Sequence, residues 1–164
     1  MISRRHALLT LPSLTLATQS EAGLVDWYNG VKVGSRLPAH EAHYISGAEQ
    51  KGAKLTLIDF WATWCAPCLE GVPHLNGLHA AYKDKGVAVV GFTQESVEVA
   101  KPFLPKARMN FSVAAGSRNS LQAALGIKAI PYALFTNAAS VIVWRGQPND
   151  ISGSLIESLL RGAA

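Results

Sequence analysis

Two continuous apolar runs constrain the fold of this chain more than any other feature of its sequence. Residues 55–60, LTLIDF, and residues 87–93, VAVVGFT, lack the alternation expected of a strand with one face in water. Such runs are typical of strands buried on both faces of a parallel sheet. The segment between them, residues 66–82, carries apolar residues at intervals of three and four, which indicates a helix. Strand, helix and strand of these lengths predict a right-handed parallel βαβ unit.

The sequence predicts further elements after this unit. In chain order they are a short proline-broken helix, an added strand, a helix with an Asn or Ser cap and a closing Gly, two strands joined by a polar turn, and a last helix. They cover residues 96–107, 111–115, 119–126, 132–136, 140–146 and 150–161.

Length and composition predict one folded domain behind two N-terminal segments. The chain has 164 residues, of which 49% are apolar, enough to bury a sizeable core. We expect an export signal over residues 1–22, an irregular arm with a short hairpin over residues 23–50, and the domain itself over residues 51–164. The fifteen basic residues are scattered and the net charge is only +4, so no nucleic-acid partner is expected.

The first 22 residues outline an export signal. A basic start at Arg4 and Arg5 precedes an apolar run too short to span a bilayer as a helix, and a small-x-small pattern ends at Ala22. The arginine pair resembles a twin-arginine signal, while an ordinary Sec signal stays open as the alternative. We therefore expect a bacterial periplasmic protein that is exported by one of these two routes.

Cys65 and Cys68 are the only cysteines of the chain. Paired thiols of exported proteins usually become structural disulfides. A bridge that closes two intervening residues, however, removes little entropy from the unfolded chain and stabilises the fold poorly. The C-x-x-C spacing places Cys65 at a helix start, where the unpaired N–H groups and the helix dipole favour a thiolate. The pattern therefore predicts a reactive pair of thiols.

The motif around these cysteines resembles the thioredoxin superfamily. The resemblance is carried by DFWATWCAPC at residues 59–68, by GIKAIP at residues 126–131, and by the hairpin and helix that follow. The export signal and the added segment after the second strand resemble its TlpA/ResA branch of periplasmic thiol-disulfide oxidoreductases. Over roughly residues 35–160, the resemblance implies a thioredoxin-like three-layer α/β/α sandwich with a mixed central sheet and an inserted αβ segment.

The resemblance also implies three catalytic residues. Cys65 would attack a substrate disulfide as a thiolate, and Cys68 would resolve the mixed disulfide that results. Asp59 lies in an apolar strand, where a buried carboxylate is costly unless it has a role. In this family the matching acid lies under the disulfide and helps to move the proton of the second cysteine. An Asp59 bonded to backbone or paired with Lys54 stays open as the alternative.

A receiving surface for a polypeptide is implied beside the cysteines. Ile130-Pro131 matches the cis-proline of the family, and other residues disfavour a cis bond by about 2.5–4 kcal/mol. We expect Trp64, Ile130 and Pro131 to form the apolar rim that binds substrate, and Trp61 to pack in the core.

No functional role is expected for the acidic residue after the second cysteine or for the two histidines of the arm. The family usually places a Glu three residues after the second cysteine, where this chain has Gly71, so Glu70 is expected to be an exposed helix charge. His40 and His43 have a weakly ligand-like spacing, and surface or capping roles are favoured for them. We expect no metal site, and no cofactor other than the redox-active Cys65–Cys68 disulfide.

The predicted function is the reduction of disulfides in other exported proteins. An Ile before the cis-proline and a buried Asp resemble reducing thioredoxins more than strongly oxidising DsbA-type proteins. A monomeric reductase is expected, fed by a membrane thiol relay, with clients such as apocytochrome c thiols during cytochrome c maturation or the cysteines of copper sites. A dithiol oxidase or isomerase, a copper chaperone and a thiol peroxidase are the alternatives.

Overall fold

The computed structural model describes residues 30–116 and 121–162 of the chain. Its strands are β1 (His43–Ser46), β2 (Leu55–Phe60), β3 (Val87–Thr93), β4 (Ser112–Ala115), β5 (Tyr132–Asn137) and β6 (Ile142–Gly146). Its helices are α2 (Ala66–Tyr82), α3 (Val97–Ala100), α4 (Leu104–Ala107), α5 (Leu121–Ala124) and α6 (Gly153–Gly162). Short 3-10 turns occur at Lys83–Lys85, Lys101–Phe103 and Pro148–Asp150.

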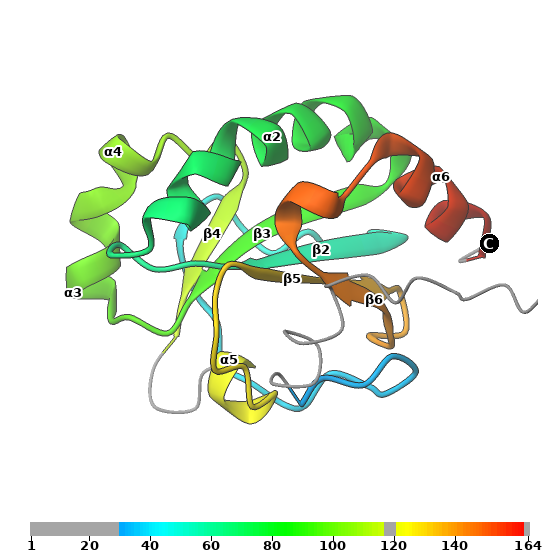
Figure 1. Ribbon diagram of the computed structural model, residues 1–164, viewed down its shortest axis with the longest axis horizontal. Coiled ribbons are helices and arrows are strands. Elements are labelled where there is room, and N and C mark those ends of the chain that lie inside the picture. Colours follow the sequence, from blue (N-terminus) through cyan, green and yellow to red (C-terminus); the bar gives the residue numbers. More distant parts are fainter. Residues whose placement is uncertain (1–29, 117–120, 163–164) are drawn as a thin grey trace, which may run out of the picture.

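The six strands form one mixed sheet in the order β1-β4-β3-β2-β5-β6. Figure 1 shows α2 and α6 on one face of this sheet, and α5 with the N-terminal arm on the other. The predicted three-layer α/β/α architecture is therefore confirmed.

The central strands β2 and β3 form the predicted parallel pair, with α2 as their connection. Alternate residues of β2 point to opposite faces. Leu55 and Leu57 pack in the cluster that includes the α2 residue Leu75, whereas Ile58 and Phe60 pack in the cluster on the other face. Because both faces are covered, β2 can be apolar along almost its whole length.

The segment between β3 and β4 forms the inserted αβ unit. The prolines divide it into α3, the turn at Lys101–Phe103 and α4, as predicted. The strand β4 then pairs with β3 in parallel and extends the sheet.

The described part of the arm does not form the short hairpin that the sequence suggested. Its strand β1 pairs instead with β4, antiparallel. The N–H of Gly34 donates to the carbonyl of Ile142 at 2.8 Å, and the N–H of Leu37 donates to the carbonyl of Ser140 at 2.8 Å. The arm thus forms backbone hydrogen bonds with β4 on one side of the sheet, and with β6 and the turn before it on the other side. The boundary at residue 50 stays a prediction.

The C-terminal part follows the predicted order. The strands β5 and β6 form an antiparallel hairpin. The last helix begins at Gly153, three residues later than predicted, because the Ser152 hydroxyl accepts the N–H of Leu155 at 3.2 Å and caps the helix there.

Two predictions fall outside the described residues. These are the export signal over residues 1–22 and the helix cap at residue 119 or 120. Among the residues that the structure describes, no helix is both long enough and apolar enough to cross a membrane.

Candidate active site

Cys65 and Cys68 form a disulfide, with an S–S distance of 2.03 Å and Cα atoms 5.3 Å apart. Cys65 directly precedes α2, and Cys68 lies in its first turn. The N–H groups of Cys68 and Leu69 both donate to the carbonyl of Cys65, at 3.1 and 3.2 Å. Each cysteine is 3% exposed, so only a small part of the bridge can be reached from solvent.

The start of α2 is suited to an anion. No side chain in the described part of the chain caps this helix end, and its first turn holds no acidic residue. The first N–H groups of a helix lack intrahelical partners and form the positive end of its dipole. When the bridge is reduced, this end of the helix favours a thiolate on Cys65.

Asp59 is a buried carboxylate on β2. It is 1% exposed, and its Oδ2 has no hydrogen-bond partner among the described residues. Burial raises the pKa of Asp59 to about 7. The structure shows no ion pair between Asp59 and Lys54, although both are described, so the pairing with Lys54 loses its basis.

The geometry brings Asp59 and the disulfide to the same face of the sheet. Because side chains alternate along a strand, Asp59 faces the same side as Trp61, which packs in one cluster with Cys65 and Cys68. The Sγ of Cys68 lies 3.9 Å from the carbonyl oxygen of Phe60, the residue after Asp59. The sulfur therefore lies over the end of β2 that carries the carboxylate.

The residues that the resemblance implies for substrate binding also lie at this place. The Ile130–Pro131 peptide bond is cis, as predicted. Ile130 packs against the cluster that contains the two cysteines, and Pro131 leads directly into β5. Trp64 is 68% exposed whereas Trp61 is fully buried, as expected for a surface ring and a core ring.

Glu95 belongs to the site but was not predicted from the sequence. Its Oε2 accepts the backbone N–H of Thr63 at 2.7 Å, and its Oε1 accepts the Thr63 hydroxyl at 2.8 Å. Thr63 lies two residues before Cys65, and Glu95 lies two residues after β3. Because β2 and β3 are parallel, their carboxyl ends lie at the same edge of the sheet. This expected proximity was the only sign in the sequence that Glu95 could meet Thr63.

Glu70 is exposed, as expected, and Gly71 is buried. A Cβ atom at Gly71 would lie 3.3 Å from Oδ1 of Asn149. The position where the family usually has a Glu is thus closely packed in this chain.

Of the two histidines of the arm, His40 packs edge-on against Phe92, with ring centroids 6.0 Å apart, on the face of the sheet away from the cysteines. Its Nδ1 lies 3.0 Å from the carbonyl oxygen of Pro38, and His43 lies on β1. In residues 30–116 and 121–162, no group of three or more His, Cys, Asp or Glu side chains is arranged to hold a metal ion.

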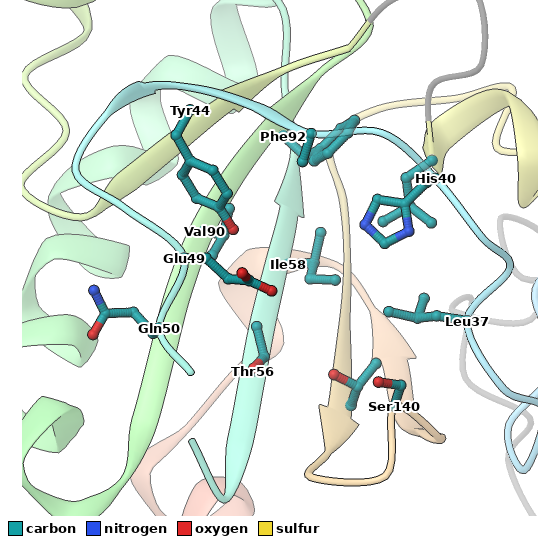
Figure 2. Close-up of a pocket in the computed structure, with 13 residues that line it drawn as sticks. Leu37, His40, Tyr44, Glu49, Gln50, Thr56, Ile58, Val90, Phe92 and Ser140 are labelled. Atoms are coloured by element: carbon teal, nitrogen blue, oxygen red, sulfur yellow. The ribbon is translucent and has the colours of Figure 1, made fainter. Parts of the chain in front are cut away.

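A hollow of about 160 Å³ lies between the arm and the sheet. Figure 2 shows Ile58, Val90 and Phe92 of the central strands facing it, with Tyr44 and Glu49 at its side. Burial and the negative charge of Glu49 raise the pKa of Tyr44. Since Ile58 and the buried carboxylate on the next residue point to opposite faces, this hollow is separate from the disulfide.

The model of one protein family, described as the AhpC/TSA family, matches residues 35–145. The chain belongs to the AhpC/TSA family. The match extends from the arm to β6 and includes both cysteines and the cis-proline.

Curated relatives of this AhpC/TSA chain include proteins named thiol-disulfide oxidoreductase ResA. The chain is 30% identical to ResA of Bacillus thuringiensis over 79 residues, which cover 48% of this chain and 46% of that protein. It is 37% identical to ResA of Oceanobacillus iheyensis over 70 residues, or 42% of this chain and 35% of that protein. The chain thus spans about half the length of these relatives or less.

Solved structures show the same fold. The thioredoxin domain of a thiol-disulfide oxidoreductase from Bacteroides vulgatus superposes with a TM-score of 0.65 at 20% identity, covering 82% of this chain and 99% of that one. A thiol:disulfide interchange protein from a Bacteroides species gives a TM-score of 0.65 at 20% identity, with 82% and 93% covered. Together with the curated relatives, they confirm the predicted resemblance to TlpA/ResA-like members of the thioredoxin superfamily.

Proposed function

We propose that this protein is an exported thiol-disulfide oxidoreductase that reduces disulfides in other proteins. The observation that carries the proposal is the Cys65–Cys68 bridge at the start of α2, on the same face of the sheet as a buried carboxylate that forms no ion pair with any described residue. The relatives named thiol-disulfide oxidoreductase ResA support it.

The first step is attack by Cys65. In the reduced protein its thiolate attacks one sulfur of the substrate disulfide. A bond forms between that sulfur and the Sγ of Cys65, and the substrate S–S bond breaks. The electron pair leaves on the other substrate sulfur, which takes a proton from water.

The second step is resolution by Cys68. Its thiol gives its proton to the carboxylate of Asp59, and the resulting thiolate attacks the Sγ of Cys65. The Cys65–Cys68 bond forms, the mixed disulfide breaks, and the second substrate thiolate leaves and takes up the proton that Asp59 releases. The substrate gains two electrons and two protons, and the cysteine pair of the protein is oxidised. A pKa of about 7 allows Asp59 to take up and release a proton near neutral pH.

The substrate surface is the rim formed by Trp64, Ile130 and Pro131. Trp64 offers an exposed aromatic ring, and Ile130 offers apolar contact beside the bridge. Such a rim suits an extended polypeptide, whose backbone can lie along it while a cystine reaches Cys65.

The pair must be reduced again after each turnover. In an oxidising compartment the electrons have to come from a dedicated donor, and we propose a membrane thiol relay in the periplasm. We further propose that the protein is exported through the Sec or twin-arginine route and is a monomer. Its proposed clients take part in cytochrome c maturation or copper-site assembly.

Trapping of the mixed disulfide tests this function. A Cys68→Ser variant lacks the resolving thiol, so it should form a stable covalent adduct with a cystine-containing protein, whereas Cys65→Ser should form much less. Mass spectrometry under non-reducing conditions measures both adducts. Equal trapping by the two variants, or none by either, would remove the proposal.

A further inference from the structure

One carboxylate holds the loop between β2 and α2 at its middle. Both oxygens of Glu95 accept hydrogen bonds from Thr63, at 2.7 Å from the backbone N–H and at 2.8 Å from the hydroxyl. Hydrogen bonds to an ionised acceptor are shorter and stronger than those between neutral groups. The loop therefore has a defined conformation at Thr63, directly before the exposed Trp64.

The carboxylate is itself positioned by the sheet. The hydroxyl of Thr93 accepts the N–H of Glu95 at 3.2 Å and donates to Oε2 at 3.3 Å. Thr93 is the last residue of β3 and is fully buried. A chain of hydrogen bonds thus runs from the rigid sheet through Glu95 to the loop, and it sets where the loop lies.

Glu95 also joins two segments that carry exposed apolar side chains. On one side is the loop with Trp64, which is 68% exposed, and on the other is α3 with Val99, which is 51% exposed. The helix α3 begins two residues after Glu95. Figure 1 shows α3 at the same end of the sheet as the start of α2, so the two segments lie at the end of the molecule that holds the disulfide.

A loop that is already held in one conformation favours a polypeptide substrate. Ordering loops and side chains on binding has a cost, about 0.5–1.5 kcal/mol for each side chain, and the part that falls on the backbone before Trp64 is avoided because Glu95 already holds Thr63. Large aromatic side chains supply much of the contact energy at protein interfaces. A small disulfide needs only the sulfur of Cys65 and gains little from this preorganisation.

We propose that Glu95 is a positioning residue that holds Trp64 ready for polypeptide substrates, and thereby makes the protein select protein disulfides over small ones. The inference rests on the proposed thiol-disulfide exchange and names its substrate class. Glu95 takes no part in the exchange of electrons or protons, since its bonds go to Thr63 and Thr93 and not to a cysteine.

The test compares a protein disulfide with a small one. Glu95→Ala removes both bonds to Thr63, Glu95→Gln keeps an oxygen that can still accept the backbone N–H, and Thr63→Ser keeps every bond as the matched control. The reduction of insulin interchain disulfides and the reaction with 5,5′-dithiobis(2-nitrobenzoate) are measured for each reduced protein. Glu95→Ala should lower kcat/KM for insulin by about three- to ten-fold, mainly through KM, and change the small-disulfide rate by less than about two-fold.

The two other variants and a double mutant separate positioning from a general structural effect. Glu95→Gln should recover part of the loss, and Thr63→Ser should behave like the wild type. In a Trp64→Ala background, Glu95→Ala should cause no further loss, because the side chain that it positions is gone. An equal loss on both disulfides, or losses that add in the double mutant, would overturn the proposal.

A measurement that does not depend on enzymatic activity separates a failure of this inference from a failure of the proposed function. If the wild type reduces neither disulfide, the proposed function fails. The positioning is then judged by hydrogen exchange of the Thr63 amide in the intact protein, which should be about ten-fold faster or more in Glu95→Ala. An unchanged exchange rate would contradict it.

Discussion

Asp59 of β2 and Gly91 of β3 lie opposite each other in the parallel pair at the centre of the sheet. The neighbour of Asp59 on the other side, in β5, is Ala133. Neither neighbour has a polar side chain, so the carboxyl group receives no cation from its flanking strands. Desolvation alone then raises its pKa to about 7, so a carboxyl group that titrates near neutral pH lies on the same face of the sheet as the disulfide.

This carboxyl group should make the stability of the oxidised protein depend on pH. Its pKa is about 7 in the folded state and near 3.8 in the unfolded state, so between these values the folded state binds the extra proton. The free energy of unfolding should therefore fall as the pH rises from about 4 to about 7, by at most about 4 kcal/mol.

Urea unfolding of the wild type and of Asp59→Asn at pH 5 and pH 8 measures this effect. The variant should lose most of the difference between the two pH values. A wild-type stability that stays flat or rises over this range, with the same slope in the variant, would show that Asp59 does not titrate as proposed.

Asp59→Asn should also slow the resolution step and spare the first attack. An amide cannot accept the proton of Cys68, and general-base assistance of this kind is worth about a hundred-fold or more. Acid-quench mass spectrometry of the mixed disulfide with a cystine peptide follows both steps. A variant whose mixed disulfide forms and decays at wild-type rates, with the same pH profile, would rule out this role.

A side chain at Gly91 should destabilise the fold. A Cβ atom there would lie 3.2 Å from both Phe111 and the indole nitrogen of Trp61, inside the packed region next to the disulfide. Gly91→Ala is expected to lower the free energy of unfolding by about 1–3 kcal/mol. Gly77 in α2 is the matched control because it has open space around it, and its change to Ala should stabilise the helix by about 0.5–1 kcal/mol. Thermal unfolding followed by circular dichroism compares them, and equal shifts for both would refute the packing argument.

The parts of the fold that were predictable are those with a local signal. The bounds of β2, α2 and β3 match the apolar runs and the helical spacing, because buried strands and a core-facing helix each impose their own period. The placement of Asp59 followed in the same way, since a carboxylate inside an apolar strand has to be buried.

The parts that were missed depend on partners far along the chain. The strand β1 pairs with β4 about 70 residues later, and nothing in its four residues distinguishes this partner from a local hairpin. The bonds between Thr63 and Glu95 cross 32 positions and join two common residue types, so neither carries a signal by itself. The start of α6 was missed for a different reason, because a single local hydrogen bond, from the N–H of Leu155 to the hydroxyl of Ser152, determines it.

The reduction potential of the Cys65–Cys68 pair tests the central claim most directly. It is measured by equilibrating the purified protein with glutathione or dithiothreitol buffers and determining the fraction of oxidised pair. The proposed reductase predicts a value near that of thioredoxin, about −270 mV. A value near that of DsbA, about −120 mV, would contradict it and make the protein an oxidant of exported chains.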